Sequence, residues 1–156
     1  MTEGNELRLE RIMDAPRDKI WQCWRDTALL EKWFCPRPWY VSDAKLELKP
    51  GGEFSTVMHG PNGEEFANAG VVLEVEPGKR LVTTDAFVPG WKPSGRPFMV
   101  ADLTLEDAGD GKTRYSVVVR HWTEEARAEH EAMGFHEGWG KAADQLEELA
   151  QRIAGE

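Results

Sequence analysis

The 156-residue chain is poor in cysteine and in basic residues, and each shortage excludes a class of protein. Its two cysteines, Cys23 and Cys35, form neither a C-x-x-C redox motif nor a zinc motif. The 19 basic side chains are outnumbered by 28 acidic ones, so the sequence shows no basic stripe for a nucleic acid. An acidic membrane surface should repel such a chain. We therefore expect no metal, no cofactor and no nucleic-acid partner.

Long apolar runs are also missing. No stretch of 18 apolar residues exists, so we expect no membrane-spanning helix, and residues 1–10 lack the apolar core of a secretory signal. These features predict a cytoplasmic protein with reduced thiols. Hydrophobic residues at 40% and charged residues at 30% are typical of a globular protein, and the length predicts a single domain over residues 1–156.

Short turns divide the middle of the chain into strands. Turn signals such as Pro50-Gly51-Gly52 and Asn62-Gly63 favour antiparallel neighbours. We expect one antiparallel sheet of about seven strands, at residues 7–13, 41–48, 53–59, 66–76, 80–88, 98–106 and 113–122. The only longer loop is expected at residues 89–97, and it contains Trp91.

Helices are expected at both ends of this strand region. Pro16 starts one helix, and Asp26 or Thr27 caps a second, shorter one. Thr123 caps an acidic helix near the C-terminus. An unbroken helix from there to Ile153 would be roughly 46 Å long. A domain of this size has a radius of gyration of only about 15 Å, so we expect a break near residues 133–134.

Glycines cluster at the start of the last helix, around Phe135 and Trp139. Gly134, Gly138 and Gly140 each make a helix interior less stable than alanine would, by roughly 1 kcal/mol. Two interpretations remain open. The glycines let the helix lie close to the sheet, or they leave room beneath the helix for a pocket.

Four segments of the chain resemble one known family. They are Ala15-Pro16 with Ile20-Trp21-x-x-Trp24 and Leu30-x-x-Trp33-Phe34; Leu48-x-x-Gly51-Gly52-x-Phe54; Val75-Glu76-Pro77-x-x-Arg80-Leu81; and Gly138-Trp139 with Leu146 and Leu149. In this order they resemble START-like helix-grip proteins (the SRPBCC superfamily). The most similar branch is the bacterial one named for homology to the C-terminal domain of the activator of heat-shock protein 90 ATPase.

The resemblance implies an α+β helix-grip fold, in which a curved antiparallel sheet wraps around a long C-terminal helix and encloses a cavity. Proteins of this superfamily bind or transform lipids, polyketides and other apolar molecules, and the branch has no shared catalytic motif. The chaperone activator also uses a separate N-terminal domain. A role as a chaperone ATPase co-regulator is therefore an alternative to ligand binding rather than the first expectation.

Candidate ligand-binding residues are taken from the last helix, the aromatic segment before the strands, and the strands themselves. They are Trp139, Phe135, Gly138, Trp33, Phe54, Met58, Phe66, Phe87, Trp91, Phe98, Asp102 and His121. For any single strand residue, ordinary core packing is favoured over contact with the cavity, because alternation places it on one of two faces. Trp91 is expected at the cavity mouth, in a lid or in a homodimer contact, since large aromatics suit interfaces.

Two polar residues complete the candidate site. His121 would anchor a ligand at the pocket mouth, unless it is a surface or satisfied core histidine. Asp102 would have a raised pKa if it pointed inward, and an outward orientation fits the strand equally well. The first hypothesis is a binder of a small, mainly apolar molecule. The alternatives are a polyketide cyclase-like enzyme that moves a proton, and an interaction module with an exposed apolar patch.

Overall fold

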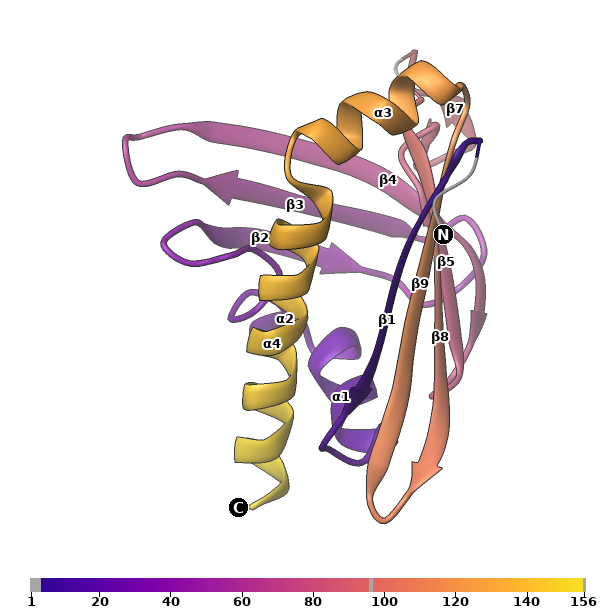
Figure 1. Ribbon diagram of the computed structural model, residues 1–156. Helices are drawn as coiled ribbons and strands as arrows, with labels where there is room; N and C mark the ends of the chain where they lie inside the picture. Colours follow the sequence, from indigo (N-terminus) through magenta and orange to yellow (C-terminus); the bar gives the residue numbers. More distant parts are fainter. Residues whose placement is uncertain (1–3, 96, 156) are drawn as a thin grey trace.

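A seven-stranded antiparallel sheet curves around the C-terminal helix in the computed structural model, which describes residues 4–95 and 97–155 (Figure 1). The order of the strands across the sheet is β1-β9-β8-β5-β4-β3-β2. The fold class and the number of strands in the main sheet agree with the expectation. The strands are β1 (Glu6–Met13), β2 (Tyr40–Leu46), β3 (Glu53–His59), β4 (Glu65–Glu76), β5 (Arg80–Thr84), β8 (Met99–Gly109) and β9 (Lys112–His121).

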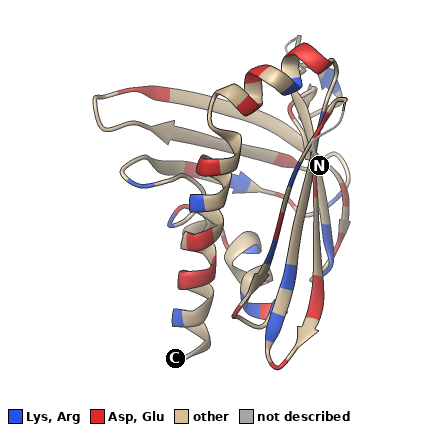
Figure 2. Ribbon diagram, in the orientation of Figure 1, with Lys and Arg blue, Asp and Glu red and all other residues tan. Residues whose placement is uncertain are grey.

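Side-chain alternation gives the sheet two different faces. On β9, Tyr115, Val117 and Val119 are buried on the concave face toward the C-terminal helix. Their neighbours Arg114 and Arg120 are exposed on the convex face. Figure 2 shows charged residues on the strands and along the helices. The concave face is therefore where the apolar core and any apolar site lie.

Four helices complete the fold: α1 (Arg17–Arg25), α2 (Thr27–Leu30), α3 (Glu124–Ala132) and α4 (Phe135–Ala154). Asp26 caps α2 by accepting a hydrogen bond from the backbone N–H of Ala28, at 3.0 Å, and Thr123 caps α3 in the same way. The expected break between α3 and α4 is present at Gly134, whose φ of 97° is left-handed. Within the described residues, no helix is long and apolar enough to span a bilayer.

The strand expected at residues 80–88 is wrong in its second half. β5 ends at Thr84, and a separate pair forms between β6 (Phe87–Val88) and β7 (Lys92–Pro93). The Asp85 carboxylate accepts hydrogen bonds from the backbone N–H groups of Phe98 and Met99, at 2.8 and 3.1 Å. Because the Asp85 side chain takes up these two backbone N–H groups, they are not available for pairing between strands, and the main chain leaves the sheet after Thr84. The expected loop at residues 89–97 therefore contains a short strand.

Candidate functional site

A cavity of about 400 Å³ lies between the concave face of the sheet and the start of α4. This volume is in the range of small-molecule sites. The sheet contributes Leu9, Phe54, Met58, Leu81, Thr83, Met99, Ala101, Leu103, Tyr115 and Val117. The segment from α1 to β2 contributes Trp24, Trp33, Phe34, Cys35, Pro36 and Trp39. The remaining wall comes from His130, Met133, Gly134, Phe135, Gly138, Trp139, Ala142 and Ala143.

The three glycines near the start of α4 act in three different ways. A Cβ on Gly138 would meet only the Cγ of Pro36, at 3.9 Å, so this glycine leaves room at the cavity. A Cβ on Gly140 would come within 2.6 Å of the Nη2 of Arg11, so this glycine leaves space for the Arg11 side chain. Gly134 supplies the left-handed turn between the helices. The open space at Gly138 agrees with room for a pocket, whereas none of these glycines lets the helix backbone lie close to the sheet backbone.

An aromatic cluster forms the wall opposite α4. The rings of Trp24 and Trp33 meet edge to face with centroids 5.0 Å apart, and Phe34 meets Phe54 in the same way at 5.7 Å. The indole N–H of Trp33 donates to the backbone oxygen of Cys23 at 3.0 Å, so its polar atom is satisfied within the protein. This wall offers carbon surface to a ligand.

Gln145, which is buried on α4, holds this wall in place. Its Nε2 donates to the backbone oxygens of Trp33 and Cys35, at 3.0 and 2.7 Å. Its Oε1 accepts from the backbone N–H of Arg37 at 2.9 Å. One amide therefore satisfies three backbone groups of an irregular segment and ties that segment to the helix.

The described cavity wall contains no Asp, Glu, Lys or Arg. Its clearly polar side chains are those of Thr83, Tyr115 and His130. Burial raises the pKa of the Tyr115 phenol above its usual range, and the nearby indole N–H of Trp24 offsets this only in part. That N–H is itself buried, and it makes no hydrogen bond of normal geometry within the described chain.

His130 forms a buried pair with His121 beside the cavity. The Nε2 of His121 lies 2.9 Å from the Nδ1 of His130, and the Nδ1 of His121 lies 2.8 Å from the backbone oxygen of Asn5. The rings of Phe135 and Trp139 contact the His130 ring, with centroids 5.2 and 5.9 Å away. Burial, and secondarily the repulsion that would arise if both imidazole rings carried a charge, lowers the pKa of His130 to about 4.

Half of the candidate residues line this cavity. Trp139, Phe135 and Gly138 do so from α4. Trp33 does so from the segment after α2, and Phe54 and Met58 do so from β3. Their contact with a ligand stays a prediction, although their place around the cavity is now established.

The other aromatic candidates lie outside the cavity. Phe66 is 56% exposed and stacks on Trp39, with centroids 6.0 Å apart. Phe87 and Trp91 belong to the β6–β7 region, where their rings meet edge to face at 5.8 Å. The ring of Trp91 also covers Gly51 in the turn before β3 and is not part of the cavity wall, and its expected homodimer contact stays a prediction. Their expected contact with the cavity is therefore wrong.

Phe98 and His121 lie one layer behind the cavity wall. Both contact His130, with ring centroids 4.9 and 5.1 Å from it. His121 is 4% exposed and satisfied by Asn5 and His130. The histidine that reaches the cavity is therefore His130, and His121 positions it.

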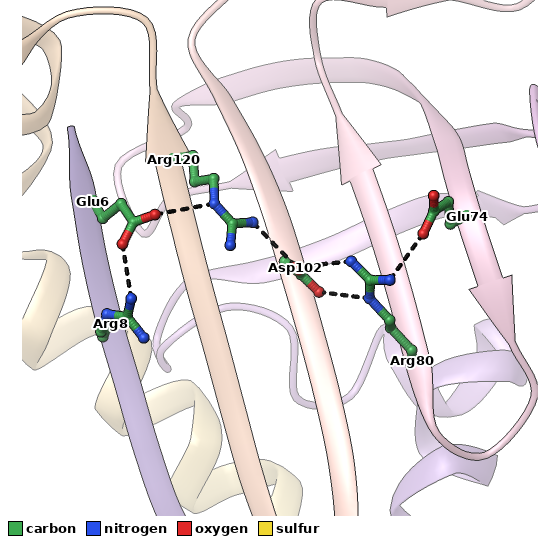
Figure 3. Close-up of polar contacts among 6 residues, drawn as sticks. All are labelled: Glu6, Arg8, Glu74, Arg80, Asp102 and Arg120. Carbon is green, nitrogen blue, oxygen red and sulfur yellow. Dashed lines mark hydrogen bonds and ion pairs between the residues drawn. The ribbon is translucent and has the colours of Figure 1, made fainter.

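Asp102 points to the convex face, away from the cavity, so its expected place in the site is wrong. It accepts two hydrogen bonds from Arg80, at 3.1 and 3.0 Å, and one from Arg120 at 3.1 Å. Figure 3 shows this carboxylate at the centre of a row of charges that continues to Glu74, Glu6 and Arg8. Burial alone would raise the pKa of Asp102, but the two guanidinium groups outweigh it and lower that pKa.

Sequence reasoning missed His130 and Tyr115 as cavity residues. Strand alternation could have identified Tyr115 as a cavity residue, because Tyr115 and Val117 share the face of β9 that carries apolar residues. His130 has no such signal, since its place depends on the direction in which α3 leaves the break at Gly134.

The sequence profile of a family described as "Activator of Hsp90 ATPase homolog 1-like protein" matches residues 14–151. The chain belongs to this family. A search of the curated proteins found no match. The family assignment agrees with the resemblance identified from the sequence.

Several solved structures share the fold. A protein of Nitrosomonas europaea is 43% identical over 97% of both chains, with a TM-score of 0.93. A protein of Mycobacterium smegmatis is 25% identical over 97% of this chain and 98% of the other, with a TM-score of 0.80. A family member from Silicibacter pomeroyi is 22% identical over 96% and 97%, with a TM-score of 0.68, and shares the fold.

Proposed function

We propose that this family member is a single-domain binder of a small, mainly apolar and uncharged molecule, held in the cavity between α4 and the sheet. The observation that carries the proposal is a volume of about 400 Å³ whose described wall has no charged side chain. An ion would enter such a site without a partner and lose its hydration, which is strongly unfavourable. A neutral apolar molecule replaces water there at a gain of about 25 cal/mol for each Å² buried.

The free cysteines agree with a protein that works in a reducing compartment such as the cytoplasm. Cys23 and Cys35 are both buried. Burial raises the pKa of each thiol to about 11, so both stay protonated and unreactive near neutral pH. They serve as apolar core residues, and Cys35 also lines the cavity.

Acid–base catalysis is a second candidate function, because His130 and Tyr115 both line the cavity. A general base works best with a pKa near the operating pH. His130, with a pKa of about 4, is a weak base at neutral pH, and Tyr115, with a raised pKa, is a weak acid. Both groups suit hydrogen bonding to a ligand better than proton transfer, so binding remains the proposal.

A neutral fluorescent probe, N-phenyl-1-naphthylamine, tests the proposal in parallel with native mass spectrometry for a co-purifying molecule. We expect saturable binding of one probe molecule. Trp139→Ala should weaken it by about tenfold or more, equivalent to about 1.4 kcal/mol or more, because the indole forms part of the wall. The free energy of unfolding should fall by much less.

Trp91→Ala is the matched control, because Trp91 is an exposed tryptophan that lies outside the cavity. Its affinity for the probe should equal that of the wild type. If Trp139→Ala lowers probe affinity and folding stability equally, Trp139 is a core residue and not a binding residue. If the wild type does not bind the probe and carries no co-purifying molecule, the proposal is wrong.

A further inference from the structure

A short chain of hydrogen bonds fixes where the protons of two buried histidines lie. The backbone oxygen of Asn5 can only accept a hydrogen bond, and the Nδ1 of His121 is 2.8 Å from it. Nδ1 of His121 therefore carries a proton and donates it to Asn5. The remaining question is the state of Nε2 on the same ring.

His121 has no partner of opposite charge among residues 4–95 and 97–155. The side chain is 4% exposed, and no carboxylate within the described residues forms a hydrogen bond or an ion pair with it. A charged ring would therefore be buried without a partner of opposite charge. In the neutral ring, Nε2 has a lone pair and accepts a hydrogen bond from the Nδ1 of His130, 2.9 Å away.

The proton on Nδ1 of His130 leaves its other nitrogen, Nε2, as an acceptor. His130 is 8% exposed and lines the cavity, and its Nε2 has no hydrogen-bond partner in the part of the chain that the structure describes. The rings around it belong to Phe98, Phe135 and Trp139. This nitrogen is not among the fully buried atoms that lack a partner, so it keeps some accessible surface, and a ligand group that donates to it would give it a hydrogen bond.

We infer that the cavity selects a neutral apolar molecule that carries a hydrogen-bond donor, such as a hydroxyl group, and that this group donates to Nε2 of His130. The inference rests on the proposed function and adds the chemical class of the ligand. A ketone, ether or carboxylate offers only acceptors, and its oxygen would face the lone pair of His130. One hydrogen bond of about 1 kcal/mol corresponds to roughly a fivefold preference.

Two probes of nearly equal shape test this selection. 2-Naphthol has a hydroxyl donor, and 2-methoxynaphthalene replaces it with an ether that only accepts. We expect isothermal titration calorimetry at neutral pH to show roughly fivefold tighter binding of 2-naphthol by the wild type. His130→Phe, which keeps an aromatic ring and removes the acceptor, should bind both probes equally.

Tyr115→Phe is the matched control, because it removes a different polar group of the same cavity and should keep the preference for 2-naphthol. If both probes bind the wild type equally, the inference is wrong while the proposed function stands. If neither probe binds, the proposed function is wrong and the inference falls with it.

A second measurement does not depend on how well His130→Phe folds. Long-range ¹H–¹⁵N correlation spectra of the wild type report which ring nitrogen of each histidine is protonated. We expect a proton on Nδ1 of both His121 and His130, and a change at Nε2 of His130 when 2-naphthol is added. A proton on Nε2 of His130 in the free protein would overturn the inference.

Discussion

Single glycines on α4 lie in different steric surroundings, and Gly138 and Gly140 are the clearest case. The missing side chain of Gly138 leaves space at the cavity, whereas the missing side chain of Gly140 leaves space for Arg11, which pairs with Asp144. The two glycines are two residues apart on one helix and have different steric surroundings. Substitution by alanine should therefore give different results at the two positions.

We expect Gly138→Ala to stabilise the protein by up to about 1 kcal/mol, because alanine favours the helix and the new methyl group meets only Pro36 at 3.9 Å. Gly140→Ala should gain clearly less, since its methyl group displaces the Arg11 guanidinium from its place beside Asp144. Urea unfolding measures both variants. A loss of stability in Gly138→Ala would contradict the open space that the structure shows there.

At the scale of strands, the row of charges on the convex face connects five neighbouring strands from β1 to β4 (Figure 3). Its central carboxylate, Asp102, has a side chain only 12% exposed, whereas the Glu74 side chain at one end is 64% exposed. Hydrogen bonds to a charged and partly buried group contribute more than ion pairs in solvent. The centre of the row should therefore matter most for stability.

We expect Asp102→Asn to lower the free energy of unfolding by about 1–3 kcal/mol, because Arg80 and Arg120 lose their shared partner. Glu74→Gln is the control and should change it by less than about 0.5 kcal/mol. Urea unfolding at neutral pH compares the two. Equal effects would show that the row acts only as surface charge.

The order and type of the elements could be predicted because they depend on local signals. Turn residues such as Gly51 and Gly63 separate the strands, and the break at Gly134 follows from helix length and a left-handed glycine. The end of β5 could not be predicted in this way. It depends on hydrogen bonds that the Asp85 carboxylate accepts from the backbone N–H groups of Phe98 and Met99, 13 and 14 positions further along the chain.

The lining of the cavity was predicted well on the helix and poorly on the sheet. The helical part follows from the spacing of Phe135, Gly138 and Trp139. On β8 the side chains of Met99 and Ala101 line the cavity, whereas the candidate from the sequence was Asp102, whose orientation was left open and which lies on the other face of the strand. Choosing residues by size or charge, rather than by one face of the strand, caused the error.

At the scale of the whole molecule, the sheet separates a charged convex face from an apolar concave face, and the histidine pair is buried on the concave side. A group whose pKa differs between the folded and unfolded chain makes stability depend on pH. For His130 the folded value of about 4 lies below the ordinary value of 6.5. Between these values the unfolded chain binds the proton and the folded protein does not.

Above about pH 6.5, His130 should therefore not affect the free energy of unfolding. As the pH drops below that value the free energy of unfolding should fall, and at pH 4 it should be lower by about 3 kcal/mol. The lowered pKa values of Asp102 and Glu6 change the free energy of unfolding mainly below pH 4, because the pKa values of these groups in the unfolded chain lie near 4. Urea unfolding at several values between pH 4 and 7 measures the effect. In His130→Phe the slope over this range should be much smaller, and an unchanged slope would assign the pH dependence to other groups.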